Sequence, residues 1–341
     1  MSPPSTIADI AREAGVGTAT VDRVLNRRPG VNAETLQRVL KAVEKLGVPQ
    51  QPGRPRRSPD FAFAYVLPAE PTPFFDLVER QIAQSAGDFR HQHITEVTHR
   101  LDASDPARFA AELAQLGGCD GLALLAPDVP AVKLAINDLV RSGVHVVTLF
   151  SDVSGSMRET YVGADNRAAG RTAGLLLGRM VGGADTLLLT SQATRLSCEI
   201  DRRIGFSQVL EERFPGLRLQ RLQELPADDE GAAAALLQAF DDGIDPARVG
   251  GLYNVGSATV GIARAVASLG LQRLPNVAAH DLCDAHQALL TTGELAYVLH
   301  QDIHYCILAA ARVLRALCEN QRGALSVVQP RVEILTAENL H

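Results

Sequence analysis

Hydrophobic residues in the first fifty positions recur at helical spacing in three short stretches. Thr6 and Asp9 form an acidic capping box at the start of the first predicted helix, and Gly15 ends it. Asn32 can cap the third helix, which Gly47 ends. The apolar positions are Ile7, Ile10, Ala11 and Ala14, then Val21, Val24 and Leu25, then Leu36, Val39, Val43 and Leu46. This arrangement is typical of a helix-turn-helix, whose second helix can lie in a DNA major groove.

From residue 61 onward, short apolar runs alternate with amphipathic stretches. The runs that predict buried strands are FAFAYVL, HITEVTH, GLALLA, VHVVTLF, TLLLT, VGGLYNV, NVAAH and PRVEIL. The stretches that predict helices lie near 74–86, 106–116, 132–142, 166–180, 201–214, 231–240 and 259–269. The alternation predicts a two-lobed α/β body with parallel sheets covered by helices on both faces. Such sheets bind ligands outside the carboxyl ends of their strands.

Charge divides the chain at the same place. Residues 1–60 carry ten Arg and Lys against six Asp and Glu, a net of +4. Residues 61–341 carry 23 against 33, a net of −10. A small basic segment on a large acidic body indicates that the first part meets a polyanion and the second does not.

Composition and motifs exclude several classes of protein. With 46% hydrophobic and 21% charged residues, the chain is neither disordered nor collagen-like. The longest uncharged stretch, 249–263, is Gly-rich and too short to span a membrane, and no secretory signal begins the chain, so we expect a cytoplasmic protein. Five Cys without a CxxC pair indicate reduced thiols. The absence of GxGxxG, GxxxxGK[ST] and GxSxG motifs removes simple arguments for nucleotide binding or hydrolysis.

The segment TIADIAREAGVGTATVDRVLNRRPGVNAETLQRVLKAVEKLG resembles the DNA-binding headpiece of the LacI/GalR family of transcription factors, above all at its AGV-x-x-x-TV-x-RVLN core. The resemblance implies that Thr18, Ala19 and Arg23 face base edges. Arg23 suits guanine, and Ala19 offers a methyl group to thymine. The alternative for Arg23 is a solvated surface arginine. The residues implied to hold phosphates are Thr6, Thr20, Asn26 and Asn32.

Two features depart from the family. Gly17 and Asp22 stand where the family usually has Ser, and we expect Asp22 to orient Arg23. The linker PQQPGRPRRSPD replaces the family's short hinge helix, and its four Pro and one Gly preclude a regular helix. The linker either contacts phosphates or a narrow minor groove, or is a flexible basic tether. Its basic residues are Arg54, Arg56 and Arg57.

Residues 61–341 resemble the periplasmic sugar-binding-protein fold that LacI/GalR regulators use as their effector domain, on the evidence of PTPFF, VGADNRAAG and RRIGF. The resemblance implies three parts: a helix-turn-helix domain at 1–48, a hinge linker at 49–60, and a two-lobed effector-binding and dimerisation domain at 61–341. The implied first lobe covers about 61–163 and 297–325. The implied second lobe covers about 165–293 and 328–341.

The resemblance also places the family's sugar contacts. Two phenylalanines would cover the apolar face of a sugar ring, while charged and amide side chains would bind its hydroxyls, which need both donors and acceptors. The implied set is Phe74, Phe75, Asp152, Arg202, Asn254, Asp281 and Gln301. Each residue has a structural alternative, such as core packing, a loop cap or an ion pair. Arg203 replaces Arg202 if the alignment shifts by one residue.

A metal site is the main competing interpretation for one region. Its histidines and cysteines are His280, Cys283, His286, His300, His304 and Cys306. No HExxH motif accompanies them, and scattered His and Cys usually serve packing, so we predict neither a metal nor a cofactor.

The resemblance implies a ligand-responsive transcriptional regulator, a repressor and not an enzyme, that binds double-stranded operator DNA as a homodimer. The implied effector is a monosaccharide or polyol, and whether it releases or promotes DNA binding stays open. The alternatives are a nucleoside or phosphorylated effector and, further away, an enzyme that modifies a sugar. No C-terminal heptads are present, so we do not expect a coiled-coil tetramer.

Overall fold

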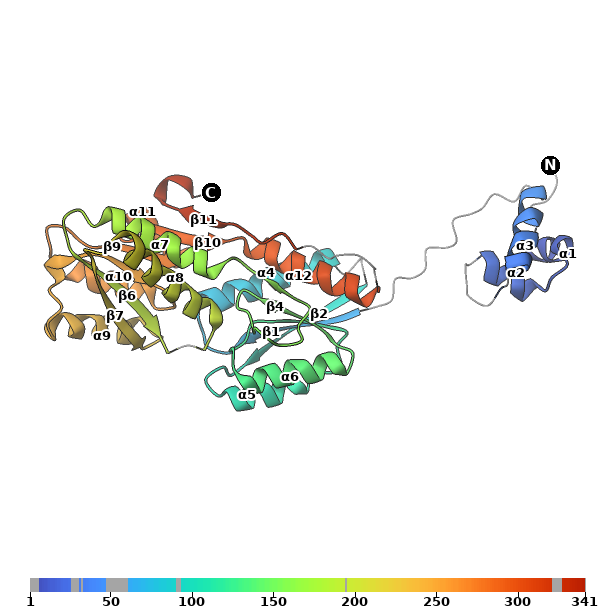
Figure 1. Cartoon of the computed structure of the whole chain (residues 1–341), viewed down its shortest axis with the longest axis horizontal. Coiled ribbons are helices and arrows are strands. Elements are labelled where there is room, and N and C mark those ends of the chain that lie inside the picture. The colour runs from blue at the N-terminus through green and yellow to red at the C-terminus, as the bar shows by residue number, and fades with distance from the viewer. Residues whose placement is uncertain are drawn as a thin grey trace. The chain divides into compact units, whose positions relative to one another are not determined.

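The computed structural model describes residues 6–25, 31, 33–46, 61–89, 93–193, 195–320 and 327–340. The chain forms two compact units, residues 1–59 and 60–341 (Figure 1). Each unit has its own hydrophobic core.

The first unit is a three-helix domain. It comprises α1 (Ile7–Ala14), α2 (Thr18–Leu25) and α3 (Ala33–Lys45). The predicted capping box is present, because the Thr6 hydroxyl accepts from Asp9 N and the Asp9 carboxylate accepts from Thr6 N. The helix ends where Gly15 adopts a φ of 62°. The shared core of the three helices is Ile10, Ala11, Ala14, Val21, Val24, Val39, Ala42 and Val43.

The second unit contains two lobes. The sheet of the first lobe is wholly parallel, with strand order β2-β1-β3-β4-β5. Its strands are β1 (Phe61–Pro68), β2 (Ile94–Leu101), β3 (Gly121–Leu124), β4 (His145–Leu149) and β5 (Thr160–Val162). Its helices are α4 (Pro73–Phe89), α5 (Pro106–Ala114) and α6 (Pro130–Arg141), and α12 (Ile303–Cys318) joins them from the far end of the chain. Alternate β1 residues enter separate cores on the two faces of the sheet: Phe63 and Tyr65 on one, Ala64 and Val66 on the other.

The sheet of the second lobe has the order β11-β10-β9-β8-β6-β7 and is parallel except for β11. Its strands are β6 (Thr186–Gln192), β7 (Arg218–Leu225), β8 (Val249–Asn254), β9 (Asn276–His280), β10 (Tyr297–Gln301) and β11 (Val332–Leu335). Its helices are α7 (Asn166–Met180), α8 (Ser197–Arg213), α9 (Asp229–Asp241), α10 (Thr259–Ser268) and α11 (Asp284–Thr292). Single 3-10 turns lie at Pro246–Arg248 and Ala337–Asn339. The two mainly parallel, helix-covered sheets confirm the predicted fold class.

The lobe boundary near the C-terminus differs from the sequence expectation. Residues 297–325 were expected to belong to the first lobe, but Tyr297–Gln301 pairs with β9 and β11 in the second sheet. The chain therefore crosses at Asp302, and of the described residues between 297 and 320 it is α12 that packs on the first sheet. The apolar run of β10 is compatible with either sheet, which is why its pattern did not reveal the crossing point.

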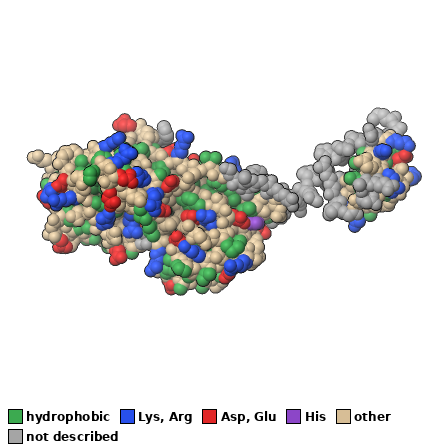
Figure 2. Space-filling model, viewed as in Figure 1, with side chains coloured by type: hydrophobic (Ala, Val, Ile, Leu, Met, Phe, Trp, Pro, Cys, Tyr) green, Lys and Arg blue, Asp and Glu red, His purple; other side chains and the backbone are tan. Residues whose placement is uncertain are grey.

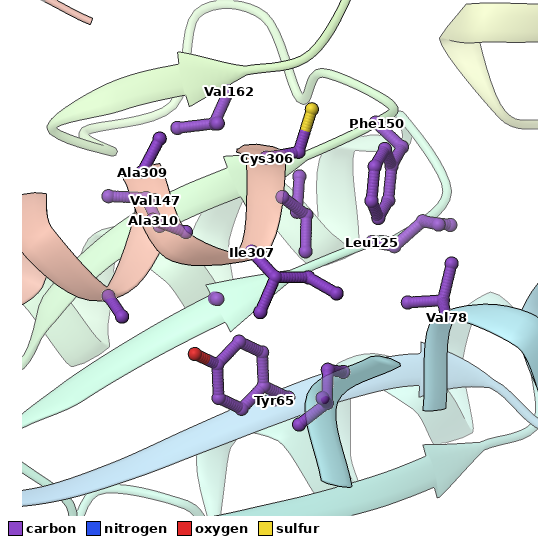
Figure 3. Close-up of a cluster of buried hydrophobic side chains, with 14 of the residues drawn as sticks. Tyr65, Val78, Leu125, Val147, Phe150, Val162, Cys306, Ile307, Ala309 and Ala310 are labelled. Carbon is purple, nitrogen blue, oxygen red and sulfur yellow. The ribbon is translucent and has the colours of Figure 1, made fainter. Parts of the chain in front are cut away.

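Helix α12 completes the core of the first lobe (Figure 3). Its Cys306, Ile307 and Ala310 lie among Tyr65 and Val147 from the strands. All five side chains are at most 1% exposed. The first lobe thus depends on a segment that follows it by about 140 residues in the sequence.

Helices α7 and α8 of the second lobe pack closely enough to require glycine. A Cβ on Gly170 would lie 1.9 Å from the backbone oxygen of Arg202, and a Cβ on Gly205 would lie 2.1 Å from that of Arg167. This close approach holds the backbone of Arg202 against α7.

The described helices were compared with the length and apolar character that a membrane span needs. None of the described helices is both long and apolar enough to cross a bilayer. On the face of the second unit shown in Figure 2, acidic and basic side chains are interspersed, so the negative charge does not gather into one patch there.

Candidate functional site

The candidate DNA-contacting surface is one face of α2. Thr18, Ala19 and Arg23 are exposed, whereas Val21 and Val24 are buried in the core of the domain. The three residues predicted to meet base edges thus share the outer face of this helix. Thr20 is half-buried beside them.

Of the residues predicted to hold phosphates, Thr6 is exposed at the start of α1, where its hydroxyl also donates to Asp9 Oδ2 at 2.6 Å. The remaining predicted DNA contacts lie outside the described residues. They are Asn26, Asn32, Arg54, Arg56 and Arg57.

The second unit has a cleft of about 1060 Å³ between its lobes. It lies at the carboxyl ends of the parallel strands, where Pro68 ends β1, Phe150 follows β4, Gln192 ends β6 and Asp281 follows β9. This is the position that the fold predicts for a ligand.

The two walls of the cleft differ in chemistry. The first-lobe wall is mostly apolar, and its main residues are Pro68, Pro71, Pro73, Phe74, Phe75, Leu77, Leu125, Pro127 and Phe150. The Phe74 ring is half-buried and packs edge-on against the Phe150 ring, with 5.5 Å between centroids. The second-lobe wall is polar and includes Gln192, Arg195, Glu199, Arg202, Arg203, Asp228, Asp229, His280, Asp281, Cys283 and His286.

Arg202 and Asp281 form the buried charged pair of the polar wall. Their side chains are 7% and 8% exposed, and Arg202 Nη2 lies 3.6 Å from Asp281 Oδ2. Burial alone would lower the pKa of Arg202, but the Asp281 carboxylate and the other groups around the guanidinium together outweigh it, so the pKa of Arg202 rises and the guanidinium stays charged. A buried pair with unused donors is suited to bind ligand hydroxyls.

His280 lies in the same wall as this pair and is neutral. Burial, helped by the charge of Arg202, lowers the pKa of His280 well below its ordinary value. Its Nε2 is hydrogen-bonded to the Tyr253 hydroxyl, and burial raises the pKa of Tyr253. The hydroxyl therefore donates to Nε2, which leaves the imidazole proton on Nδ1.

Cys283 and His286 form a second polar pair at the start of α11. Burial works against the Cys283 thiolate, but the hydrogen bond and charge of His286 together with nearby backbone amides outweigh it, so the pKa of Cys283 is lowered. The pKa of His286 is raised although burial opposes its charge, because it contacts the Cys283 sulfur and donates from Nδ1 to the Asp281 carbonyl at 2.7 Å.

Four of the seven predicted effector contacts line the cleft: Phe74, Phe75, Arg202 and Asp281. Asn254 is fully buried next to it. Its Nδ2 donates to Ser257 O at 2.8 Å and to Thr259 Oγ1 at 2.9 Å, and its Oδ1 accepts from Thr190 at 3.0 Å. Asn254 thus shapes the loop 256–259, whose residues do line the cleft.

Asp152 and Gln301 are also engaged elsewhere. The Asp152 carboxylate pairs with Arg158, and its backbone oxygen accepts from Ser197 of the second lobe at 2.6 Å. Burial opposes the charge of Asp152, but Arg158 and Thr148 outweigh it and lower its pKa. Gln301 Nε2 donates to Asp281 Oδ1, and Gln301 Oε1 accepts from the backbone amide of Ala164, in the segment that joins β5 of the first lobe to α7 of the second.

Backbone strain is concentrated around the cleft. Phe150, Glu224, Ala258 and Asp281 have φ between 58° and 63° and line it. They are four of the six non-glycine residues with positive φ among the described residues. Such conformations are uncommon for side chains of this kind and gather at functional sites.

Sequence reasoning did not single out several lining residues. Glu70 lies in the loop after β1 and has a buried Oε2 with no hydrogen-bond partner. Arg195 and Arg203 line the polar wall, and neither forms an ion pair within the described residues. Arg203 was considered only as a substitute for Arg202, and nothing in the local sequence distinguishes Glu70 or Arg195 from surface residues. His280, Cys283 and His286 do meet at the cleft, but no group of three His, Cys, Asp or Glu side chains in the described chain could hold a metal.

Comparison with known proteins finds two family profiles. "Bacterial regulatory proteins, lacI family" matches residues 6–48, and "Periplasmic binding protein domain" matches residues 63–322. The HTH-type transcriptional regulator MalR of Streptomyces coelicolor is 42% identical over 79 residues, which are 23% of each chain. The chain thus aligns with about a quarter of that relative's length.

Solved structures resemble the second unit. A putative LacI transcriptional regulator from Bacteroides fragilis matches with a TM-score of 0.73 and 17% identity, over 82% of this chain and 98% of that one. A solute-binding protein from Burkholderia graminis, solved with D-arabinose, matches with a TM-score of 0.71 and 20% identity, over 83% and 97%. At these identities the likeness shows the fold.

Proposed function

Because the chain belongs to the periplasmic binding protein domain family and carries a lacI-family helix-turn-helix domain at residues 6–48, we propose that it is a ligand-responsive, sequence-specific DNA-binding transcriptional regulator. It acts as a repressor in the cytoplasm, where it meets double-stranded operator DNA. The effector is a monosaccharide or polyol bound between the two lobes.

The contrast between the walls of the cleft carries the effector assignment. Phe74 offers an aromatic surface from the first lobe, and Arg202 with Asp281 offers charged donors and acceptors from the second. A sugar ring has an apolar face and a hydroxyl-bearing edge, so it complements both walls at once. The solute-binding protein of the same fold that holds D-arabinose supports this choice.

A homodimer follows from the DNA-binding part. One helix such as α2 reads a short half-site, and a symmetric dimer addresses two half-sites of a pseudopalindrome. Closure of the lobes on the effector changes how the two DNA-binding domains are held. Since coupling between sites is reciprocal, operator DNA changes the affinity for the effector by the same factor.

Calorimetric titration of the full chain with D-arabinose, D-glucose, D-galactose and myo-inositol tests the effector. We expect one of them to bind at micromolar affinity and the binding to be lost in Arg202→Ala and Asp281→Asn. Arg248→Ala is the matched control, because Arg248 pairs with Asp185 outside the cleft. No binding by any of the four would contradict the sugar assignment.

Arg195 and Arg203 favour one alternative effector. Their guanidinium groups line the cleft without an ion pair in the described chain, and they could balance a phosphate. D-glucose 6-phosphate therefore joins the panel. If D-glucose 6-phosphate binds the wild-type chain and not Arg203→Ala, the effector is a phosphorylated sugar and not a neutral one.

Selection of double-stranded DNA from a random pool tests the other half of the function. We expect a pseudopalindromic site, and weaker binding with relaxed preference at one base pair in Arg23→Ala. Arg12→Ala is the control, because Arg12 is exposed on α1 and pairs with Asp9. Equal affinity for all sequences would contradict a specific regulator, and operator affinity unchanged by a bound effector would contradict the coupling.

A further inference from the structure

Five buried residues in and behind the polar wall of the cleft form a closed ring of polar contacts. Arg202 Nε donates to Asn166 Oδ1 at 2.8 Å, and Asn166 Nδ2 lies 3.4 Å from Ala164 O. The Ala164 amide donates to Gln301 Oε1 at 3.3 Å. Gln301 Nε2 donates to Asp281 Oδ1 at 3.3 Å, and Asp281 closes the ring at 3.6 Å from Arg202. All five residues are at most 7% exposed.

The ring joins two of the segments that connect the lobes. Ala164 lies between β5 of the first lobe and α7 of the second. Gln301 ends β10 of the second lobe, and Asp302 leads directly into α12 of the first. Movement of one lobe against the other must change the backbone in these segments. We call them the hinge between the lobes, which is distinct from the linker at 49–60, and the ring lies at this hinge.

Only part of the ring faces the ligand space. Arg202 and Asp281 line the cleft, whereas Asn166, Ala164 and Gln301 lie behind them in the described chain. The ring uses Nε and Nη2 of Arg202 and leaves Nη1 to other partners. Because buried polar groups are costly to leave unpaired, a change at Arg202 disturbs the groups behind it.

The carboxamide of Asn166 has two separate tasks. Its oxygen faces a guanidinium, which can only donate, and this fixes the orientation of the amide. Its nitrogen lies near Ala164 O in the segment between β5 and α7, and near two acceptors of the first lobe, Phe150 O at 3.2 Å and the Tyr161 hydroxyl at 3.1 Å. One half of the amide thus contacts Arg202, and the other contacts the first lobe and the segment that leads from it.

We propose that Asn166 is a positioning residue of the effector site, which orients the Arg202 guanidinium through Oδ1 and ties it to the hinge between the lobes through Nδ2. The ligand part of this inference rests on the proposed function, whereas the ring can be tested without a ligand.

Hydrogen exchange of the full chain without ligand tests the hinge half. In Asn166→Ala we expect the amides of residues 161–165 to exchange about 10-fold faster, because the crossover loses its anchor. Tyr161→Phe removes one hydroxyl and gives a smaller acceleration in the same peptide. Asn276→Ala is the matched control, since Asn276 also donates to two backbone oxygens of the second lobe but lies away from the hinge.

Sugar affinity tests the other half. For the panel sugar that binds the wild-type chain, Asn166→Ala weakens binding about 10-fold although Asn166 does not line the cleft. Asn166→Asp keeps an acceptor for Arg202 and stays within about 3-fold of the wild type, while its hinge exchange is as fast as that of Asn166→Ala. A residue with a merely structural role would not separate the two readouts.

Unchanged exchange at 161–165 in both Asn166→Ala and Tyr161→Phe would overturn the hinge half. If Asn166→Ala does not fold, as judged by circular dichroism, Asn166→Asp decides this point, because it loses the Nδ2 donor and keeps the acceptor for Arg202. Equal loss of sugar affinity in Asn166→Ala and Asn166→Asp would overturn the positioning half. If no panel sugar binds the wild type, the sugar assignment fails, and the exchange result still decides whether the ring holds the hinge.

Discussion

The two lobes have the same sheet-and-helix architecture, yet they present opposite chemistry to the cleft. The first lobe contributes prolines and phenylalanines held by ordinary core packing. The second contributes a buried ion pair held by a ring of hydrogen bonds. Hydrogen bonds need a defined geometry whereas apolar contacts do not, so we expect the first wall to provide contact area and the second to provide selectivity.

Breaking the charged wall gives the largest expected effect. Arg202→Ala leaves the buried Asp281 carboxylate without its cation and should lower the free energy of unfolding by about 3–5 kcal/mol. Arg158→Ala, which breaks the more exposed Asp152 pair of the first lobe, should cost about 1 kcal/mol. Urea denaturation of both variants measures the difference, and equal losses would mean that burial does not separate the two pairs.

Two adjacent phenylalanines of the apolar wall, Phe74 and Phe75, are expected to differ in what they contribute. Phe75 is 8% exposed and belongs to the core, so Phe75→Ala should lower the free energy of unfolding by about 3 kcal/mol. Phe74 is half-buried at the cleft, so Phe74→Ala should cost less stability and weaken sugar binding about 10-fold. Thermal unfolding and calorimetry distinguish the two. If Phe75→Ala weakened sugar binding and Phe74→Ala did not, Phe75 and not Phe74 would be the sugar contact.

Close helix packing in the second lobe gives a smaller effect. A Cβ on Gly170 meets the Arg202 backbone, which cannot rotate away, so Gly170→Ala should cost about 2 kcal/mol of stability. Gly216→Ala is the control, because no heavy atom lies within 4 Å of the added Cβ, and it should change stability by less than about 0.5 kcal/mol. A stable Gly170→Ala protein would show that α7 and α8 can separate.

Thiol reactivity gives the smallest effect. The pKa of Cys283, in the second lobe, is lowered. In the first lobe, burial raises the pKa of Cys119 and raises the pKa of Cys318 to about 11. Since the thiolate reacts and its fraction rises with pH, alkylation of Cys283 by iodoacetamide should become fast at a lower pH than that of the other two. Mass spectrometry of the labelled sites measures the rates, and His286→Gln should slow only Cys283.

Much of the fold was predictable, because buried parallel strands are continuous apolar runs and helices carry local stop signals such as Gly15. The strand β7 (Arg218–Leu225) was missed, since it is an edge strand whose polar residues interrupt the run. The strands β5 and β10 and the helices α11 and α12 were not among the predicted elements either.

The position of the site and the types of residue in it were predictable, but the partners of its individual side chains were not. Arg202 and Asp281 come to the cleft wall as expected, but Gln301 reaches a partner 137 positions away, which no local pattern encodes. The orientation of Asn254 depends likewise on Thr190 in a neighbouring strand. Tertiary partners decide whether an amide faces the ligand or the scaffold.

The late position of α12 also sets an order for folding during synthesis. Residues 61–163 leave the ribosome long before 303–318, the helix that covers one face of their sheet. At about 5–20 residues per second, roughly 8 to 30 s pass while the face that Ile307 and Ala310 will cover is still open. The nascent first lobe therefore exposes apolar surface in every round of translation, and we expect its folding yield to depend more on expression temperature than that of the second lobe.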